Sequence, residues 1–479
     1  MVSRNPRLLA VEILNRIDAS GAFAEPLLDH TLSRRQQSDP RDRGLLTELV
    51  YGTLRRRGFL DWVLDQFLHK GLAPADIPLR NILRTALYQL FFTDRIPGHA
   101  AVYEAVTLAG QLCPGREALV NAVLRNVLRR RDQLPYPDRR EDFRSYAAIM
   151  HSHPVWLIER WERQWGEEET LALCRANNSV PAQILRVNRL QKTREKVKEE
   201  LLREGIRTEE TRYAPEGLAV RDAEKPLRET ASYRAGRFQL QDEASQLIGL
   251  LVAPVAGETV LDLCAGRGGK ATHLAELMDN RGKIIAVELR ASKIKQLHVL
   301  AARLGIRIIE AMAADATQPL PGIFPGCFDR VLVDVPCSGL GTLRRSPEIK
   351  WRLTPGQLHR QTFLQQSLLA RAGEYVRPGG RLIYSTCSIM REENEEVVTA
   401  FLDRHPEFHL CLPTGVAPDL FDGQGCLRTF PHRQGTDGFF GAVMEKDTHL
   451  DCGDGPTPTD PAPSPAMTGS GGPPRHRDR

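Results

Sequence analysis

The sequence predicts a multidomain protein: an all-helical bundle, then a small α+β module, then an α/β domain with an open, mainly parallel sheet. Three observations lead to this fold class. The length of 479 residues corresponds to two to four domains at roughly 100–200 residues each. Apolar residues recur at helical spacing in the first part of the chain, and strand and helix patterns alternate in the last part. We place the domains at residues 1–140, 145–235 and 236–446.

The composition excludes several classes of protein. Hydrophobic residues make up 41% of the chain and charged residues 26%, which is typical of a globular protein. The longest apolar stretch, residues 247–257, is about half of the ~20 residues that span a bilayer, so no transmembrane helix or membrane partner is expected. The N-terminus does not resemble a signal peptide, because charges interrupt its apolar run.

Nine scattered cysteines without a CxxC pair indicate a reducing, cytoplasmic location, free thiols and no metal site. A monomer is the default expectation.

The first domain, residues 1–140, has the apolar periodicity of a helical bundle throughout. Two arginine clusters in it, Arg55–Arg57 and Arg129–Arg131, are compatible with a polyanionic partner or with solvated helix faces. The polar, proline-containing segment Pro137–Phe143 is typical of a linker.

Residues 145–235 change character. A strand-like run at 181–187 is followed by a charged helix at 194–205 and short β-like pieces around 217–220, an order that predicts a small α+β, RRM-like module. The last segment, 447–479, is rich in Pro and Gly and poor in apolar side chains. It cannot bury enough surface to offset the entropy of ordering, so we predict that it is disordered.

Strands and helices alternate in the third domain, which is typical of an open parallel sheet with an antiparallel edge. The expected strands are 259–263, 283–289, 307–313, 328–335, 381–387 and 438–444. The expected helices between them include 291–304, 355–376 and 392–402.

A glycine-rich turn follows the first of these strands, in the segment Leu261–His273. Gly266, Gly268 and Gly269 precede a helix, so backbone N–H groups at the helix N-terminus are open to a ligand. The segment is neither GxGxxG nor a Walker loop, because Lys270 lacks the GxxxxGK spacing. Taken alone, it fits several nucleotide-like cofactors or a tight structural turn.

Acidic residues follow the next strands. Glu288 stands where doubly wound folds accept from ribose hydroxyls, although a helix cap is an alternative. Asp315, after the third strand, is a candidate acceptor for an adenine amino group, and Asp334 ends the fourth. Three acids at successive strand ends indicate one crevice.

Two cysteines also stand at strand ends, Cys337 and Cys387, each in a Cys-Ser pair. Either one alone fits a small core residue. Together beside a cofactor loop they favour reactive thiols, because a nearby cation lowers a thiol pKa and makes the thiolate nucleophilic. Lys270 and Arg267 are the nearest cations in the sequence.

At these residues the sequence resembles the RNA (cytosine-5)-methyltransferases. The segments DLCAGRGGK, DVPCSG and YSTCS are similar to the cofactor loop and the two cysteine motifs of that family, and GRFQLQDEASQL, GTLRRSPEIKW and FPHRQGTDGFF agree with it. The N-terminal region, with RDRGLLTELVYGTLRR and NAVLRNVLR, resembles the NusB-type RNA-binding domain of the RsmB (Sun/Fmu) subgroup, which acts on 16S rRNA.

The resemblance implies a Rossmann-like domain that uses S-adenosylmethionine to methylate C5 of a cytosine in 16S rRNA. It implies that Cys387 is the nucleophile, that Cys337 helps release the product and that Asp334 holds the base edge. The implied cofactor residues are Cys264, Ala265, Gly266, Arg267, Gly268, Gly269, Lys270, Glu288, Asp315 and Asp334.

One departure leaves alternatives open. Gly266 and Arg267 replace the Ala-Pro pair usual in the family's loop, which adds a cation near a sulfonium cofactor. Two alternatives follow. One is an RNA-binding ribosome-assembly factor with a weakened site, and the other is the same chemistry on tRNA or large-subunit rRNA. A nicotinamide oxidoreductase gives no use for two Cys-Ser pairs. Arg344 and Arg345, beside the Cys337 motif, fit substrate phosphates or a solvated loop.

Overall fold

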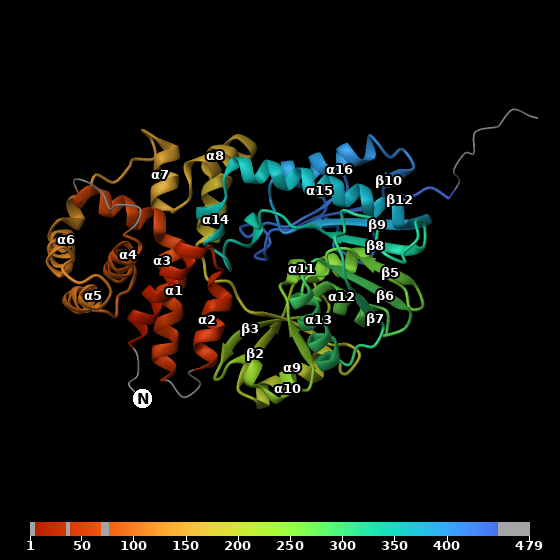
Figure 1. The fold of residues 1–479 in the computed structure, drawn as a ribbon, viewed down its shortest axis with the longest axis horizontal. Helices are drawn as coiled ribbons and strands as arrows, with labels where there is room; N and C mark the ends of the chain where they lie inside the picture. Colours follow the sequence, from red (N-terminus) through yellow and green to blue (C-terminus); the bar gives the residue numbers. More distant parts are fainter. Residues whose placement is uncertain (1–4, 35–38, 69–75, 449–479) are drawn as a thin grey trace, which may run out of the picture.

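The computed structural model describes residues 5–34, 39–68 and 76–448. A helical bundle lies at one end of the molecule, and a small module and a larger α/β domain lie beside it (Figure 1). The predicted fold class is confirmed. No helix within the described ranges is long and apolar enough to cross a bilayer. The predicted disorder of 447–479 concerns residues that, from 449 on, lie outside the described ones.

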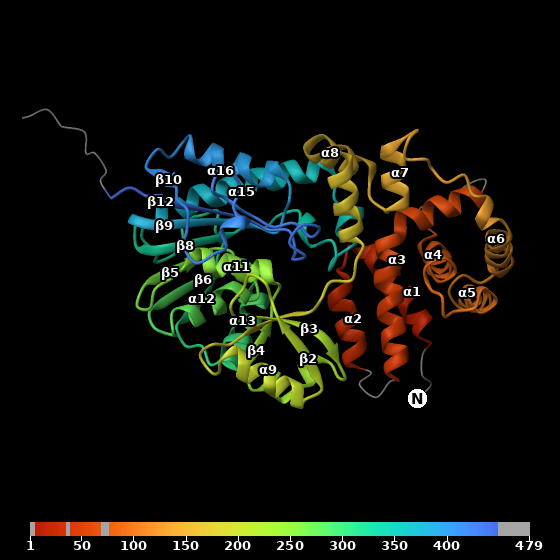
Figure 2. The ribbon, with the colours of Figure 1, turned by 180° about the vertical axis from the view of Figure 1, so that it is seen from behind.

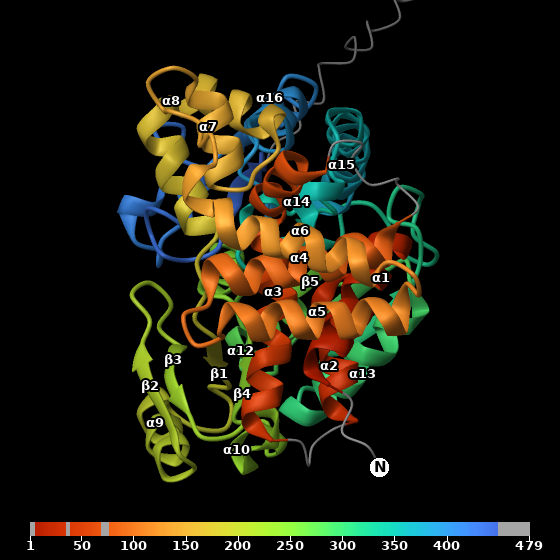
Figure 3. The same cartoon turned by 90° about the vertical axis from the view of Figure 1, so that its left-hand side faces the viewer.

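The bundle consists of six helices, and α4, α5 and α6 lie alongside one another (Figure 3). Asn5 and Asp39 each accept from a backbone N–H of the first turn, and a proline at the first position fixes the helix start. Fully buried leucines and valines fill the centre, among them Leu49, Leu60 and Leu83. The helices are α1 (Pro6–Ser20), α2 (Ala24–Ser33), α3 (Pro40–Phe67), α4 (Ile77–Phe92), α5 (Gly98–Leu112) and α6 (Glu117–Arg130).

Two further helices, α7 (Phe143–Met150) and α8 (Val155–Asn177), connect the bundle with the α/β domain (Figure 2). Gly166, at φ +80°, kinks α8. Trp161 of α8 is fully buried in a core that also contains Leu340 and Met390, which follow the two Cys-Ser pairs in the chain. These helices therefore support the loops that carry the candidate thiols.

The middle module is a four-stranded antiparallel sheet in the order β2-β3-β1-β4, with two helices. Its last strand lies past residue 235, where we expected the module to end, and pairs with β1. Its core contains Leu185, Leu201 and Phe238. The elements are β1 (Ile184–Val187), α9 (Arg194–Arg203), β2 (Ile206–Glu210), β3 (Gly217–Ala223), α10 (Ala231–Arg234) and β4 (Phe238–Leu240).

The α/β domain has an eight-stranded sheet in the order β10-β12-β9-β8-β5-β6-β7, with β11 paired to β12. Strands β5 to β9 are parallel, whereas β12 is antiparallel to β9 and β10, which is the expected antiparallel edge. The strands are β5 (Thr259–Asp262), β6 (Lys283–Glu288), β7 (Ile309–Ala313), β8 (Phe328–Asp334), β9 (Val376–Thr386), β10 (Phe408–Leu410), β11 (Leu427–Arg428) and β12 (Phe440–Lys446). The helices are α11 (Glu243–Val252), α12 (Gly269–Leu277), α13 (Ala291–Leu304), α14 (Ile349–Arg352), α15 (Pro355–Tyr375) and α16 (Glu395–Leu402).

The bundle contacts the α/β domain through the first arginine cluster. Buried Arg55 donates to the Arg344 carbonyl (3.1 Å), and Lys350 and Trp351 of α14 donate to carbonyls of α3 (3.1 and 2.9 Å). Arg57 pairs with Asp18 at 3.0 Å. Arg55 and Arg57 are therefore committed to contacts within the protein, which argues against an open polyanion surface at this cluster, whereas Arg129–Arg131 are exposed.

A buried arginine joins the middle module to helix α12. Arg186 of β1 is fully buried and donates to both carboxylate oxygens of Glu276 (3.0 and 2.8 Å) and to the Gly269 carbonyl (2.8 Å). Burial raises the pKa of Glu276, although Arg186 opposes that shift. The guanidinium thereby fixes the first residue of α12, directly after the glycine-rich turn.

We expect Arg186→Met to lower the free energy of unfolding by about 3–5 kcal/mol, because Glu276 is then left buried without a partner. Urea unfolding followed by fluorescence measures this change. Arg221→Met, which removes an exposed ion pair with Glu209 (2.7 Å), is the control and should change stability by less than about 1 kcal/mol. Equal effects of the two substitutions would contradict the assigned role of Arg186.

Candidate active site

The candidate site lies where the order of successive strands in the sheet reverses. Strands β6 and β7 lie on one side of β5, and β8 and β9 lie on the other. In open α/β sheets, ligands bind at the carboxyl ends of the strands on either side of such a switch point. Here those ends carry the glycine-rich turn after β5 and Asp334 at the end of β8.

The glycine-rich turn has the conformation that its sequence requires. Gly266 and Gly268 have φ of +59° and +87°, a region that favours glycine. A Cβ on Gly268 would lie 2.6 Å from Leu297, so the turn packs closely on α13. Arg267 is exposed. The two residues that depart from the family's loop are thus compatible with a formed turn, and the added cation is on the surface.

Asp262, the last residue of β5, is a candidate that the sequence analysis missed. It is fully buried, and neither carboxylate oxygen has a hydrogen-bond partner in the protein. Burial, with Asp334 adding, raises its pKa to about 7. A buried carboxylate without a partner fits the ammonium end of an amino-acid-bearing cofactor such as S-adenosylmethionine. The only sequence signal was an acid among apolar residues at a strand end.

The other two predicted cofactor acids differ in their surroundings. Glu288, at the end of β6, is buried and accepts from the Arg290 N–H (3.0 Å) and Lys293 Nζ (3.2 Å). Asp315 is exposed and accepts from the N–H and hydroxyl of Thr317 (2.9 and 2.8 Å), hydrogen bonds that lower its pKa. Both carboxylates lie at the carboxyl ends of strands that are parallel to β5, the strand before the glycine-rich turn.

The structure brings the two candidate thiols together. The Sγ atoms of Cys337, after β8, and Cys387, after β9, lie 3.3 Å apart. The hydrogen bond with Cys387 raises the pKa of the Cys337 thiol, and burial adds to this effect. Cys337 therefore keeps its proton at neutral pH and is placed to donate it toward Cys387.

An ion pair lies beside the thiols. Lys270 Nζ is 2.6 Å from Asp334 Oδ2, and the Ser385 hydroxyl donates to Asp334 Oδ1 at 2.8 Å. Burial lowers the pKa of Lys270, but Asp334 outweighs burial, with Cys387 and Asp262 adding, so the net pKa is raised. The cation that faces the thiol pair is therefore Lys270, whereas the other cation considered, Arg267, is exposed.

Cys264, the first residue of the predicted cofactor loop, is partly buried against the core of the sheet. Burial, with Asp262 adding, raises the pKa of Cys264, so this residue stays a neutral thiol. The eight cysteines within the described part of the chain are all free. No group of three or more His, Cys, Asp or Glu side chains in residues 5–34, 39–68 and 76–448 is placed to hold a metal ion.

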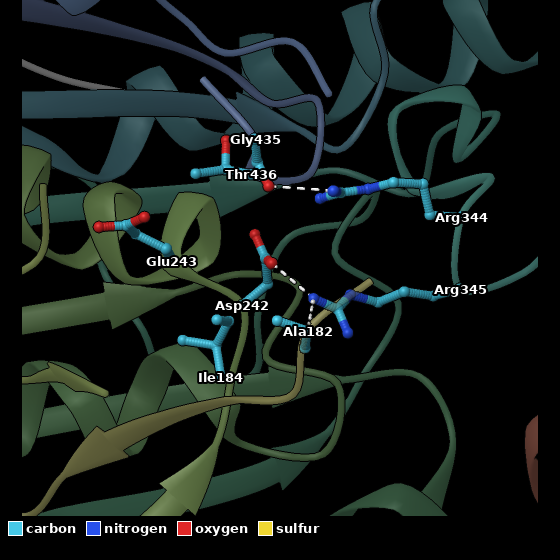
Figure 4. Close-up of a pocket in the computed structure, with 8 residues that line it drawn as sticks. All are labelled: Ala182, Ile184, Asp242, Glu243, Arg344, Arg345, Gly435 and Thr436. Carbon is cyan, nitrogen blue, oxygen red and sulfur yellow. Dashed lines mark hydrogen bonds and ion pairs between the residues drawn. The ribbon is translucent and has the colours of Figure 1, made fainter. Parts of the chain in front are cut away.

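Arg344 and Arg345 fit neither of the two interpretations offered from the sequence. Arg344 pairs with buried Asp437 at 3.1 Å, and Arg345 joins Asp437 and Asp242 at 2.7 Å each. Figure 4 shows Arg345 directed at Asp242 and at the Ala182 carbonyl, which precedes β1. The two arginines tie the loop after Cys337 to the α/β domain and to the middle module.

The doubly wound sheet, the glycine-rich turn and the paired thiols define an S-adenosylmethionine-dependent methyltransferase. Family models agree over three parts of the chain. "16S rRNA methyltransferase RsmB/F" matches residues 249–445, the NusB family matches 4–129, and the ferredoxin-like domain of RsmF/B-like methyltransferases matches 153–225.

Relatives cover nearly the whole chain. Probable ribosomal RNA small subunit methyltransferase B of Bacillus subtilis (strain 168) is 37% identical over 93% of this chain and 100% of its own length. Ribosomal RNA small subunit methyltransferase B of Cronobacter sakazakii is 32% identical over 93% and 99%. The crystal structure of PH0851 superposes with a TM-score of 0.79 at 30% identity, covering 93% of this chain and 100% of that one. The chain belongs to the RsmB/F family of 16S rRNA methyltransferases.

Cofactor affinity should depend on pH through Asp262. Its carboxyl is neutral below about pH 7 and ionised above, and the ionised form attracts the cofactor's ammonium group. We expect S-adenosylhomocysteine to bind roughly tenfold more tightly at pH 8 than at pH 6. Calorimetric titration measures this.

Asp262→Asn should bind weakly at both pH values, because the amide cannot ionise. Asp403→Asn, at an exposed position, is the control and should keep the pH dependence of the wild type. A wild-type affinity that does not change between pH 6 and 8 would rule out this role for Asp262.

Proposed function

We propose that this protein methylates C5 of a cytosine in 16S rRNA, with Cys387 as the nucleophile. The observation that carries the proposal is the pair of thiols 3.3 Å apart, beside the Lys270–Asp334 ion pair and the glycine-rich turn. The names of the relatives, ribosomal RNA small subunit methyltransferases B, support the choice of substrate.

The chemistry explains why a thiol is needed. C5 of cytosine is too weak a nucleophile to take a methyl group directly. Attack of the Cys387 sulfur on C6 forms an S–C6 bond and makes C5 enamine-like. S-adenosylmethionine, when bound, supplies the methyl group to C5. Loss of the C5 proton to solvent then lets the S–C6 bond break by elimination, so that the sulfur of Cys387 leaves as a thiolate and the aromatic base is restored.

Two neighbours of Cys387 have separate roles in this scheme. Asp334, held by Lys270 and Ser385, holds or protonates the N3/N4 edge of the base, which stabilises the adduct. Cys337 retains its proton and assists release of the product. The target base must be single-stranded or turned out of its helix to reach these groups.

The cofactor site in this proposal comprises the turn and the acids at the strand ends. Its residues are Cys264, Ala265, Gly266, Arg267, Gly268, Gly269, Lys270, Glu288, Asp315 and Asp334, with Asp262 added from the structure. Exposed Arg267 contributes main chain rather than charge to it. The formed turn favours an active enzyme over an assembly factor with a weakened site.

The domain limits 1–140, 145–235 and 236–446, with the middle module extended to include β4, belong to the same proposal. The first two domains supply affinity for 16S rRNA in it. The exposed Arg129–Arg131 cluster, at the end of α6, is a candidate phosphate contact. We further propose that the protein acts in the cytoplasm as a monomer. The eight cysteines of the described ranges are free, which fits a reducing compartment and supports the location.

The proposal predicts that label from S-adenosylmethionine enters unmodified 16S rRNA at one cytosine and that Cys387→Ala abolishes transfer. Bisulfite sequencing locates the product. Cys327→Ala, at an exposed cysteine, is the matched control and should transfer like the wild type. Wild-type protein that binds the rRNA but transfers nothing at saturating cofactor would refute the enzymatic role.

Cys337→Ala should accumulate a covalent RNA–protein adduct, because the S–C6 bond forms but release is slow. A denaturing gel with labelled RNA shows the adduct as a band of reduced mobility. The band should disappear in the variant that carries both Cys337→Ala and Cys387→Ala. An adduct that persists in this double variant would mean that Cys387 is not the nucleophile.

A further inference from the structure

The serines of the two Cys-Ser pairs meet on one buried carboxylate. The Ser338 N–H donates to Glu393 Oε1 (2.7 Å), and its hydroxyl donates to Oε2 (2.5 Å). The Ser388 hydroxyl donates to the same Oε2, and the two hydroxyls lie 3.1 Å apart. Ser338 directly follows Cys337, and Ser388 directly follows Cys387. One side chain therefore holds both segments that carry the thiols.

Glu393 is itself held rigidly. It is fully buried in the short 3-10 turn η4 (Arg391–Glu393), which precedes α16. Gln365 of α15 donates one amide to Oε1 and to the Pro336 carbonyl, both at 3.0 Å. The Tyr384 hydroxyl of β9 donates to the Glu393 carbonyl. The carboxylate thus accepts four hydrogen bonds, about its full capacity, so its oxygens are satisfied at a fully buried position.

The main chain provides only part of this alignment. The Gly341 N–H donates to the Cys387 carbonyl (2.9 Å), which joins the two loops beyond the cysteines. It does not set the direction of the Ser338 and Ser388 side chains. The contacts to Glu393 act at the residue next to each thiol, where a small rotation moves the sulfur atom.

We propose that Glu393 is a positioning residue that aligns the two thiols through Ser338 and Ser388. This inference rests on the proposed function, in which those thiols react. Glu393 is not bonded to either sulfur, so it acts only through the serines. In the wild type, Oε2 accepts from both serine hydroxyls and Oε1 accepts from the Ser338 N–H. In Glu393→Gln, an amide NH2 group replaces one of these oxygens, so the side chain can no longer accept all three hydrogen bonds.

The first measurement reports thiol alignment without using methyl transfer. Diamide oxidises two adjacent thiols to a disulfide: each sulfur loses a hydrogen to the N=N bond, which becomes a hydrazine. Mass spectrometry of alkylated peptides from the full-length protein follows the Cys337–Cys387 link. We expect the rate of linking to fall about tenfold in Glu393→Gln, because misplaced groups lose proximity. Glu396→Gln, an exposed neighbour, is the control and should link at the wild-type rate.

The second measurement is methyl transfer to 16S rRNA. We expect kcat of Glu393→Gln to fall by about 10²-fold while KM for the RNA and the affinity for S-adenosylhomocysteine stay unchanged. Ser388→Ala, which keeps the carboxylate, should also lower kcat without changing KM or cofactor affinity, but to a smaller degree. It replaces Glu393→Gln as the test variant if that protein does not fold. A change in cofactor affinity and KM with unchanged linking would indicate a merely structural role.

The outcomes separate this inference from the proposed function. If wild-type protein transfers no methyl group but linking still slows in Glu393→Gln, the positioning role stands and the proposed function fails. If wild-type thiols do not link, or Glu393→Gln and Ser388→Ala both link at the wild-type rate, Glu393 does not align them and the inference is wrong.

Discussion

The parallel pairing of strands β5, β6, β8 and β9 is the constraint on which the site depends. Parallel strands end at the same edge of the sheet, so residues far apart in the chain meet there without any direct attraction. Because the strand order reverses at β5, the turn after β5 lies beside Asp334 at the end of β8, and Cys387 lies one strand further on. The Lys270–Asp334 ion pair then spans the switch point itself.

Polar side chains with long reach connect the three domains around that edge. Arg186 reaches from the middle module to α12, Arg345 donates to the Ala182 carbonyl that precedes β1, and Lys350 reaches the bundle. Each side chain bonds to acceptors of another segment, so loss of one partner would leave the other buried without its hydrogen bond, at a cost of about 1–3 kcal/mol.

Much of the fold could be predicted from sequence periodicity, because strands such as Lys283–Glu288 are buried on both faces and contain a continuous apolar run. The thiol pair could be predicted because strand ends are local features. Asp262 and Glu393 could not, because their roles depend on missing or convergent partners that appear only in three dimensions. Arg344 and Arg345 were misjudged because a basic pair in a loop carries no sign of its buried acids, Asp437 and Asp242.

Lys270 shows why cofactor and base chemistry are electrostatically linked here. It belongs to the first turn of α12, yet its ammonium group faces Asp334 and adds to the charge balance at Cys387 and Asp262. Asp334 in turn raises the pKa of Asp262, so the two carboxylates share one cation. A second cation at Asp262 would relieve that repulsion and favour the ionised form of Asp262. Lys270 therefore couples the carboxylate at the end of β5 to the thiol of Cys387 by charge alone.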